Sequence, residues 1–262
     1  MDVGARSQGR ELLNKVPEVT LWFWLIKVMA TTVGETAADL LSVRLNMGLT
    51  VTSLIMTAVF IIALVVQVRA RAYVPSFYWF TVVAISVVGT LISDNLVDGL
   101  GISLVTTSIA FAIILAIVFV AWYRSEGTLS IHSIFTTERE LYYWAAILFT
   151  FAMGTSVGDL LTEKLNLGYG QAAIVFAAMI AAVAFLHYVA KMDAVLSFWI
   201  AYILTRPLGA SMGDLFAKPV IAGGFGLGTV TTSLIFLGAI LLLVVYLTVS
   251  KADRLDPAPT RG

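Results

Sequence analysis

The chain has 262 residues, of which 60% are hydrophobic and only 12% are charged, and its mean hydropathy is +0.95. A soluble domain is about 25% charged, so this composition excludes a soluble globular protein and indicates an integral membrane protein. The formal net charge of zero gives no sign of nucleic-acid binding, and the absence of cysteine excludes disulfides, thiolate metal sites and cysteine nucleophiles.

Eight apolar segments follow a polar N-terminal tail, residues 1–17, which lacks the apolar core of a signal peptide. Each segment is close to the length of about 20 residues that a helix needs to cross a bilayer. None alternates in polarity as the strands of a membrane β-barrel do. The sequence therefore predicts an all-α membrane protein with eight transmembrane helices and a polar C-terminal tail, residues 251–262. The predicted helices span roughly residues 19–43, 48–68, 76–98, 102–123, 140–163, 168–190, 194–218 and 228–249.

A tryptophan, a glycine and an aspartate recur at fixed spacing in every second predicted helix. The aspartate lies 15 residues after the tryptophan and five after the glycine, and successive tryptophans are 55, 65 and 55 residues apart. A fixed period with fixed internal spacing indicates one structural unit used four times. The four sets are Trp24/Gly34/Asp39, Trp79/Gly89/Asp94, Trp144/Gly154/Asp159 and Trp199/Gly209/Asp214.

Each repeat joins a helix that carries the aspartate to a following helix of almost purely apolar composition, so we expect four helical hairpins. They cover residues 18–73, 74–126, 140–193 and 194–250, with a linker at 127–139. Because each hairpin crosses the membrane twice, the four repeats are parallel rather than inverted. The first and third repeats correspond at an offset of 120 residues, as do the second and fourth, which predicts two pseudo-symmetric halves.

Lysine and arginine are distributed unequally between the two predicted sides of the membrane. Because basic residues are retained on the cytoplasmic side, the side that holds most of them, with both termini, is predicted to be cytoplasmic. The repeated tryptophans then fit an aromatic belt at the cytoplasmic interface. The eleven basic residues on this side are Arg6, Arg10, Lys15, Arg69, Arg71, Arg124, Arg139, Lys191, Lys251, Arg254 and Arg261, and the three on the other side are Arg44, Lys164 and Lys218.

Polar residues spaced four apart form a stripe on each aspartate-bearing helix, because residues at this spacing share a helix face. A charged stripe facing lipid is too costly, so these faces are expected to line the bundle interior or an aqueous cavity. The stripes comprise Lys27, Thr31, Glu35 and Asp39; Ser86, Thr90, Asp94 and Asp98; Thr155, Asp159 and Glu163; and Arg206, Ala210, Asp214 and Lys218. Arg206 lies two turns from Asp214 on one face, and we expect it to act as a tethered cation for that aspartate.

Three of the apolar helices carry a pair of hydroxyl residues at a matching position, and the helix of the third repeat has two alanines there. A hairpin that turns midway places these hydroxyls at the depth of the aspartates, roughly 10 Å below the turn. The repeated glycines lie just below this layer, where they favour either close packing or an interruption of the helix that frees carbonyls for an ion. The pairs are Thr52–Ser53, Thr107–Ser108, Ala172–Ala173 and Thr232–Ser233.

The polar layer within the membrane holds five acidic residues and only two basic residues, Lys27 and Arg206. This excess of negative charge favours binding of a cation. Carboxylate, hydroxyl and carbonyl oxygens suit Mg²⁺, Ca²⁺, Mn²⁺, Na⁺ or protons. No covalent cofactor is expected. The predicted ion-binding residues, and the predicted ligands of a metal, are Glu35, Asp39, Asp94, Asp159 and Asp214. The predicted supporting residues are Lys27, Thr31, Thr52, Ser53, Thr90, Asp98, Thr107, Ser108, Thr155, Arg206, Ser211, Thr232 and Ser233.

The chain resembles a family of bacterial integral membrane proteins built from four tandem two-helix repeats, each with a tryptophan and a small-residue and acid motif. The likeness covers about residues 15–250. The stretches that carry it are Lys27 to Asp39 (KVMATTVGETAAD), Gly89 to Asp94 (GTLISD), Gly154 to Asp159 (GTSVGD) and Thr205 to Asp214 (TRPLGASMGD). The resemblance implies a multi-pass protein of the bacterial inner membrane. It implies no function, because the family is one of unassigned role.

A secondary transporter or exporter of a small hard cation fits these features best, with the acid layer between the two halves as its site. The chain has no nucleotide-binding motif, so ATP is not expected to drive transport directly. A channel through the lipid bilayer is a related alternative. The sequence leaves open the ion, the direction of transport and the oligomeric state, a homo-oligomer included.

Two alternatives belong to other classes of protein. An intramembrane aspartyl protease fits Asp159 and Asp214, which stand in Ser-x-Gly-Asp contexts that begin at Ser156 and Ser211, because such a dyad needs two carboxyls that share a proton. A membrane scaffold or sensor would instead use the stripes as internal ion pairs. In that case the two bases of the layer are expected to neutralise Glu35 and Asp214.

Overall fold

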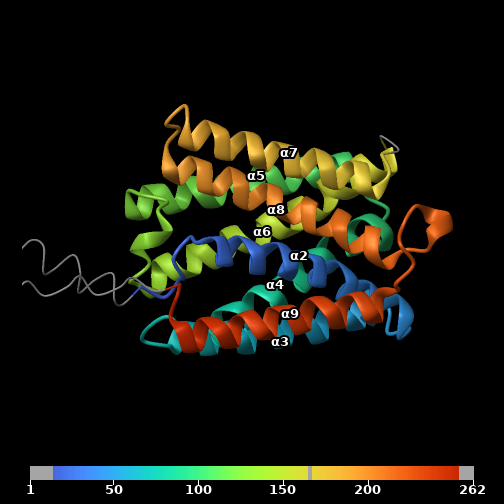
Figure 1. Ribbon diagram of the computed structural model, residues 1–262, viewed down its shortest axis with the longest axis horizontal. Coiled ribbons are helices and arrows are strands. Elements are labelled where there is room, and N and C mark those ends of the chain that lie inside the picture. Colours follow the sequence, from blue (N-terminus) through green and yellow to red (C-terminus); the bar gives the residue numbers. More distant parts are fainter. Residues whose placement is uncertain (1–13, 165–166, 254–262) are drawn as a thin grey trace, which may run out of the picture.

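The computed structural model of the protein describes residues 14–164 and 167–253, which form eight long helices and no strand (Figure 1). The predicted all-α class is therefore confirmed for the described residues. Once the short π-helical turns after α2, α4 and α6 are included, the helix ends differ from those predicted by at most three residues. The helices are α2 (Leu21–Asp39), α3 (Leu49–Arg69), α4 (Pro75–Asp94), α5 (Leu104–Glu126), α6 (Thr137–Asp159), α7 (Tyr169–Tyr188), α8 (Ala194–Ala217) and α9 (Thr229–Ser250).

Local sequence explains where the aspartate-bearing helices begin. The side chains of Thr20, Thr136 and Asp193 precede α2, α6 and α8 and accept hydrogen bonds from backbone N–H groups three residues further on. Such caps satisfy donors that have no partner within the first turn of a helix. The helix α4 starts instead with Pro75, whose missing N–H is no loss at this position.

Seven of the eight long helices are long and apolar enough to cross a membrane, and α2 is the one that is not. The reason is its composition, because Lys27, Glu35 and Asp39 lie on a helix that also carries three threonines. The prediction of eight crossings is therefore supported by composition for seven helices. The structure describes a multi-pass membrane protein in which α2, with its three charged residues, lies inside the bundle.

The helices form an inner set of four and an outer set of four. The inner helices α2, α4, α6 and α8 contact one another in a closed ring, and Figure 1 shows them between the paired outer helices α5 and α7 on one side and α3 and α9 on the other. The outer helices expose many large apolar side chains, such as Leu54, Ile117, Ile174 and Leu242. An apolar outer surface of this kind suits contact with lipid.

Each outer helix packs mainly against the inner helix of the next repeat rather than against the inner helix of its own. Thus α3 contacts α4, α5 contacts α6, α7 contacts α8, and α9 returns to contact α2. The two helices of a repeat are therefore consecutive in the sequence but are not each other's main packing partners. Each inner helix of the ring is covered by the outer helix of the preceding repeat. The pseudo-symmetry of the two halves stays a prediction.

The repeated glycines make the closest contacts between inner helices, and the helices run through them without interruption. A Cβ atom added to Gly34 would lie 2.0 Å from Ser86 Oγ on α4, and one added to Gly209 would lie 1.8 Å from Thr31 Oγ1 on α2. Gly89 contacts α6 and Gly154 contacts α8 in the same way. The close-packing interpretation is therefore confirmed, and the predicted break at these glycines is wrong.

The repeated tryptophans lie mostly inside the bundle. Trp79, Trp144 and Trp199 are buried, and Trp24 is half-buried. Trp199, for example, contacts the rings of Phe119, Trp122, Tyr143, Phe198 and Tyr202. The aromatic rings thus form a core at the end of the bundle where the inner helices begin, and the repeated tryptophans, expected in an interfacial aromatic belt, pack within this core.

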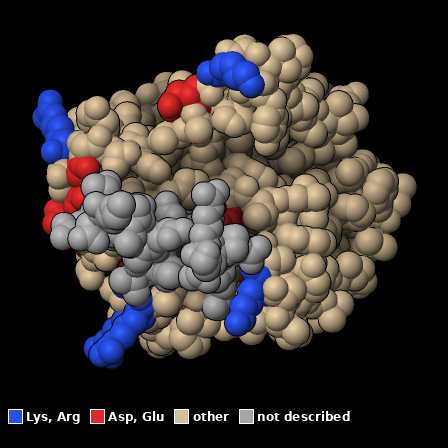
Figure 2. Space-filling view, turned by 60° about the vertical axis from the view of Figure 1, so that its left-hand side comes forward, with Lys and Arg blue, Asp and Glu red and all other residues tan. Residues whose placement is uncertain are grey.

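The first and last described residues pack against the same end of the bundle. Lys15 Nζ lies 2.9 Å from Glu140 Oε2 and donates to the Val68 carbonyl, and the Tyr73 hydroxyl bonds the Asp253 carboxylate. Figure 2 shows Lys and Arg side chains toward the margins of this end. Most of the two predicted polar tails, residues 1–13 and 254–262, lies outside the described residues, whereas residues 14–17 pack against the bundle.

Candidate functional site: an acidic cavity

The four repeated aspartates line one cavity of about 340 Å³ at the end of the bundle opposite the chain ends. Glu35 and Asp98 line it as well, so six carboxyl groups face the same space. The lining includes the exposed residues Gly168 and Ala222, which shows that the cavity opens at this end. All five residues predicted to bind an ion, and the supporting residue Asp98, are therefore brought together.

A change of helix type at the aspartates helps to place three of them. The helices α2, α4 and α6 each end at the repeated aspartate and continue for five residues as a π-helix. These turns are η1 (Leu40–Arg44), η2 (Asn95–Gly99) and η4 (Leu160–Lys164). A π-helical turn widens the helix and redirects the residues that follow, and such turns are frequent at functional sites. The fourth repeat has no such turn in α8, and a glycine-rich loop follows it.

That glycine-rich loop holds Lys218 at the cavity. The N–H groups of Phe225, Gly226, Leu227 and Gly228 return to bond the last carbonyls of α8 and the Lys218 carbonyl. Gly223 has a φ of 86°, in the left-handed region that favours glycine. A Cβ on Gly224 would lie 2.2 Å from the Lys218 carbonyl oxygen. The loop therefore needs glycine, and it fixes the position of the lysine.

Lys218 bridges two of the repeated aspartates. Its Nζ lies 2.7 Å from Asp39 Oδ2 and 3.5 Å from Asp214 Oδ1. Burial lowers the pKa of Lys218, but the carboxylates of Asp214 and Asp39 outweigh that effect, so the pKa lies above its ordinary value. The lysine therefore remains positively charged at any physiological pH, and one ammonium group already occupies part of the acidic cavity.

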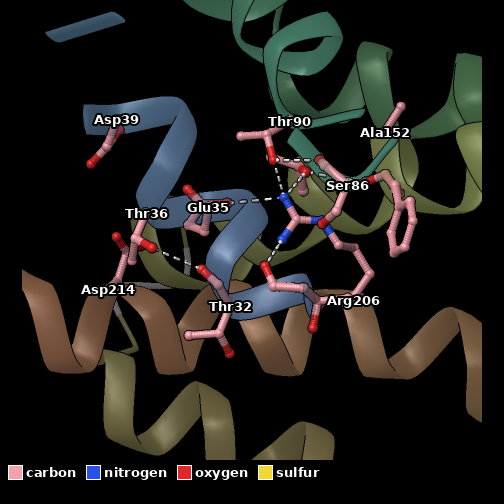
Figure 3. A network of polar contacts seen from close by, with 12 residues as sticks. Thr32, Glu35, Thr36, Asp39, Ser86, Thr90, Ala152, Arg206 and Asp214 are labelled. Atoms are coloured by element: carbon pink, nitrogen blue, oxygen red, sulfur yellow. Dashed lines mark hydrogen bonds and ion pairs between the residues drawn. The ribbon is translucent and has the colours of Figure 1, made fainter. Parts of the chain in front are cut away.

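Arg206 lies deeper in the bundle and is completely buried. Its guanidinium donates hydrogen bonds to the Thr31 carbonyl at 3.0 Å, to Glu35 Oε2 at 3.1 Å, to Thr155 Oγ1 at 2.8 Å and to the Thr90 hydroxyl. Figure 3 shows the guanidinium beside Glu35 and Thr90, with the carboxyls of Asp39 and Asp214 on the far side of Glu35. The arginine thus joins α8 to each of the other three inner helices.

The predicted pairing of Arg206 with Asp214 is wrong. Helical side chains lean toward the N-terminus of their own helix, so Arg206 points away from an aspartate two turns further along. Lys218, which directly follows α8 and is held by the glycine-rich loop, reaches that carboxylate. Arg206 pairs with Glu35 instead. The tethered cation at Asp214 is therefore Lys218.

Lys27 does not pair with an acid. Its ammonium is completely buried and lies 3.8 Å from the ring centroid of Phe151 and 4.0 Å from that of Tyr202. Within the described structure Nζ has no hydrogen-bond partner. The rings supply a cation–π contact, which partly offsets the cost of burying a charge. The predicted neutralisation of Glu35 by Lys27 is wrong, because Arg206 takes that place.

The predicted hydroxyl layer around the aspartates is not present in the described lining of the cavity. Ser53 Oγ accepts a hydrogen bond from the Asn95 side chain, and Ser233 bonds Thr36. The remaining hydroxyls are Thr52, which bonds its own helix, and Thr107, Ser108, Thr232 and Ser211, which are buried. The hydroxyl residues of the outer helices face the neighbouring inner helix, because each outer helix is displaced onto the next repeat.

The carboxyl groups surround the cavity but do not gather into a tight cluster. Among the described side chains, no group of three or more acids or histidines is close enough to hold a metal ion. The Glu163 side chain of the third stripe lies outside the described residues. Sequence reasoning missed Thr162 and Tyr169, which also line the cavity. The sequence could have indicated Thr162, because it follows Asp159 by three residues and residues at this spacing share a helix face.

A family model matches four consecutive segments of the chain, residues 22–73, 77–128, 142–193 and 197–253. It is described as Repeat of Unknown Function (DUF347). The chain belongs to this family. The four segments coincide closely with the repeats deduced from the tryptophan and aspartate spacing, so the predicted repeat family is confirmed. No curated protein and no solved structure matches the chain.

Proposed function

We propose that the protein is a secondary transporter of a small cation and that the acidic cavity is its binding site. One observation carries the proposal: each of the four repeats contributes its aspartate to one cavity in a bundle with an apolar outer surface. Six acids and one lysine line this space. Ionisable groups at such a position are costly, and inside membrane proteins they commonly mark ion pathways.

The bundle is open at one end of this path and closed at the other. Below the cavity lie the buried side chains of Arg206 and Lys27, and beyond them lies the aromatic core. A transporter that exposes its site to one side at a time requires such a closed segment. The arrangement therefore supports transport by alternating access more than a continuous pore.

We further propose that all eight long helices cross the bacterial inner membrane and that both termini are cytoplasmic. The helix α2 lies alongside the other inner helices in Figure 1, and its charged groups face the bundle interior. The distribution of lysine and arginine supports this orientation. The acidic cavity then opens on the side opposite the cytoplasm.

Cation flux into proteoliposomes tests the function. Asp39→Asn and Asp159→Asn remove one carboxylate each at nearly constant size, and we expect each to reduce cation flux at least about tenfold, as for other ionisable groups on ion pathways. Mg²⁺, Mn²⁺, Ca²⁺, Na⁺ and protons are the cations to screen. Flux at the wild-type rate in both variants would show that the cavity is not the transport site.

Asp193→Asn is the matched control. Asp193 is exposed at the opposite end of the bundle, where it caps α8. Asparagine caps helices about as well as aspartate, so the control removes the same charge with little effect on folding. We expect its flux and melting temperature to equal those of the wild type.

A membrane scaffold is the second candidate, and the internal ion pairs favour it. Arg206 pairs with Glu35, and Lys218 bridges Asp39 and Asp214, so two bases and three acids already neutralise part of one another. Under this alternative no screened cation raises the melting temperature of the purified protein. A transporter should be stabilised by its cargo, because a ligand that binds only the folded state raises stability by mass action.

A further inference from the structure

The position three residues before each repeated glycine contacts the glycine of the preceding repeat. Thr31 contacts Gly209, Ser86 contacts Gly34, and Arg206 contacts Gly154. Phe151 makes the equivalent contact with Gly89. Arg206 is thus the fourth member of a repeated contact, and of the four it is the one with a charged side chain.

The position one residue after each glycine supplies the groups that Arg206 reaches. These residues are Glu35, Thr90, Thr155 and Ala210. The guanidinium bonds the first three, one from each of the other inner helices. Ala210, on the same helix as the arginine, is small. The guanidinium therefore lies among the four inner helices, between the acidic cavity and the rest of the interior.

We propose that Arg206 is the closure of the cation path beneath the acidic cavity. A buried positive charge repels a cation that moves inward from the carboxylates, as arginines do in pores that exclude cations. The hydrogen bonds to α2, α4 and α6 hold the four inner helices together at this level. Cations pass only when these bonds separate. This inference rests on the proposed function, because it places the closed gate directly below the proposed binding site.

The test measures passive leak of K⁺ and protons through protein in proteoliposomes. Arg206→Gln removes the charge, and Glu35→Gln/Arg206→Gln removes the charge together with its counter-charge. The double variant leaves no unpaired buried carboxylate, so we expect it to fold even if the single variant does not. Arg139→Gln is the matched control, because Arg139 pairs with Glu126 at the opposite end, where Arg139 Nε lies 2.6 Å from Glu126 Oε2.

We expect leak at least about tenfold above wild type in whichever charge-removed variant folds, since a buried charge is a large barrier to an ion of the same sign. Arg139→Gln should leak no more than wild type. Wild-type leak in folded Arg206→Gln or in the folded double variant would overturn the proposal. Folding is judged by melting temperature and a single species in size-exclusion chromatography.

The leak assay needs no knowledge of the transported cation. If Asp39→Asn and Asp159→Asn transport normally, the proposed binding site fails, while the leak of the Arg206 variants still reports on closure. If those aspartate variants lose transport and the Arg206 variants do not leak, the binding site stands and the closure fails. The two failures are therefore distinguishable.

Discussion

Two basic side chains pair with acids at different depths in the bundle. Lys218 bridges Asp39 and Asp214 at the cavity, and Arg206 pairs with Glu35 beneath it. The lean of helical side chains toward the N-terminus directs Arg206 away from Asp214, and the packing of α2 against α8 supplies Glu35 as its partner. The Lys218–Asp39 pair is partly exposed, with 34% and 28% of the two side chains accessible, whereas the Arg206–Glu35 pair is buried and held by several hydrogen bonds. We therefore expect a different effect from removing each base.

Removing Lys218 should strengthen cation binding. In Lys218→Gln the carboxylates of Asp39 and Asp214 lose a competing ammonium, so the Kd for the transported cation should fall by about twofold to tenfold, as expected for the loss of a partly exposed ion pair. The measurement is calorimetric titration of purified protein with each screened cation. Arg124→Gln, on an exposed residue at the far end, controls for net charge and should leave the Kd unchanged. Weaker binding by Lys218→Gln would show that the lysine positions the acids instead.

Breaking the Arg206–Glu35 pair should destabilise the fold strongly. Glu35→Gln leaves the Arg206 charge buried without its counter-charge, and removing one partner of a buried pair costs about 3–5 kcal/mol. Glu35→Gln/Arg206→Gln should recover most of that loss, because no charge is then left unpaired. A double-mutant cycle on unfolding in detergent measures the coupling. Additive losses would mean that the two residues do not interact as the structure shows.

At the level of helices, the sequence predicts the repeat and the bounds of its helices more easily than it predicts which helices pack together. Apolar length predicts the helix bounds, and the fixed position of Gly34 and its equivalents predicts close contact. Three features escape this reasoning: the π-helical turn after Asp39, the transfer of α3 onto α4, and the partner of Arg206. Each depends on which helices become neighbours, and spacing within one helix carries no information about that. The stripes still predict the cavity residues, because burying carboxyl groups requires a shared polar space.

The inner ring should be sensitive to a single methyl group. In Gly209→Ala the new Cβ would lie 1.8 Å from Thr31 Oγ1 and 3.0 Å from the Thr32 backbone nitrogen, so α2 and α8 must separate. Overpacking of this kind costs about 1–3 kcal/mol. Gly238→Ala on α9 is the control, because nothing lies within 4 Å of its added Cβ. We expect the control to be neutral or slightly stabilising, since alanine favours helix by about 0.5–1 kcal/mol. Equal melting temperatures for the two variants would contradict the packing.

For the molecule as a whole, the two ends of the bundle have opposite characters. One end is closed by the Lys15–Glu140 pair and the aromatic core. The other end opens into a cavity lined with carboxyl groups. A bundle that is open at one end and closed at the other matches a single state of an alternating-access cycle. Because most of the described basic residues lie at the closed end, the orientation of the protein in the membrane determines which aqueous compartment the cavity faces.

Labelling of single cysteines tests that orientation with no background, because the natural chain has no cysteine. Ala222→Cys places a thiol on an exposed residue of the cavity lining, and Ser125→Cys places one on an exposed residue at the end of α5 near the closed end. If the positive residues are retained in the cytoplasm, a membrane-impermeant maleimide added to intact cells should label Ala222→Cys. It should label Ser125→Cys only after the cells are opened. The reverse pattern would place the cavity in contact with the cytoplasm and would overturn the proposed orientation.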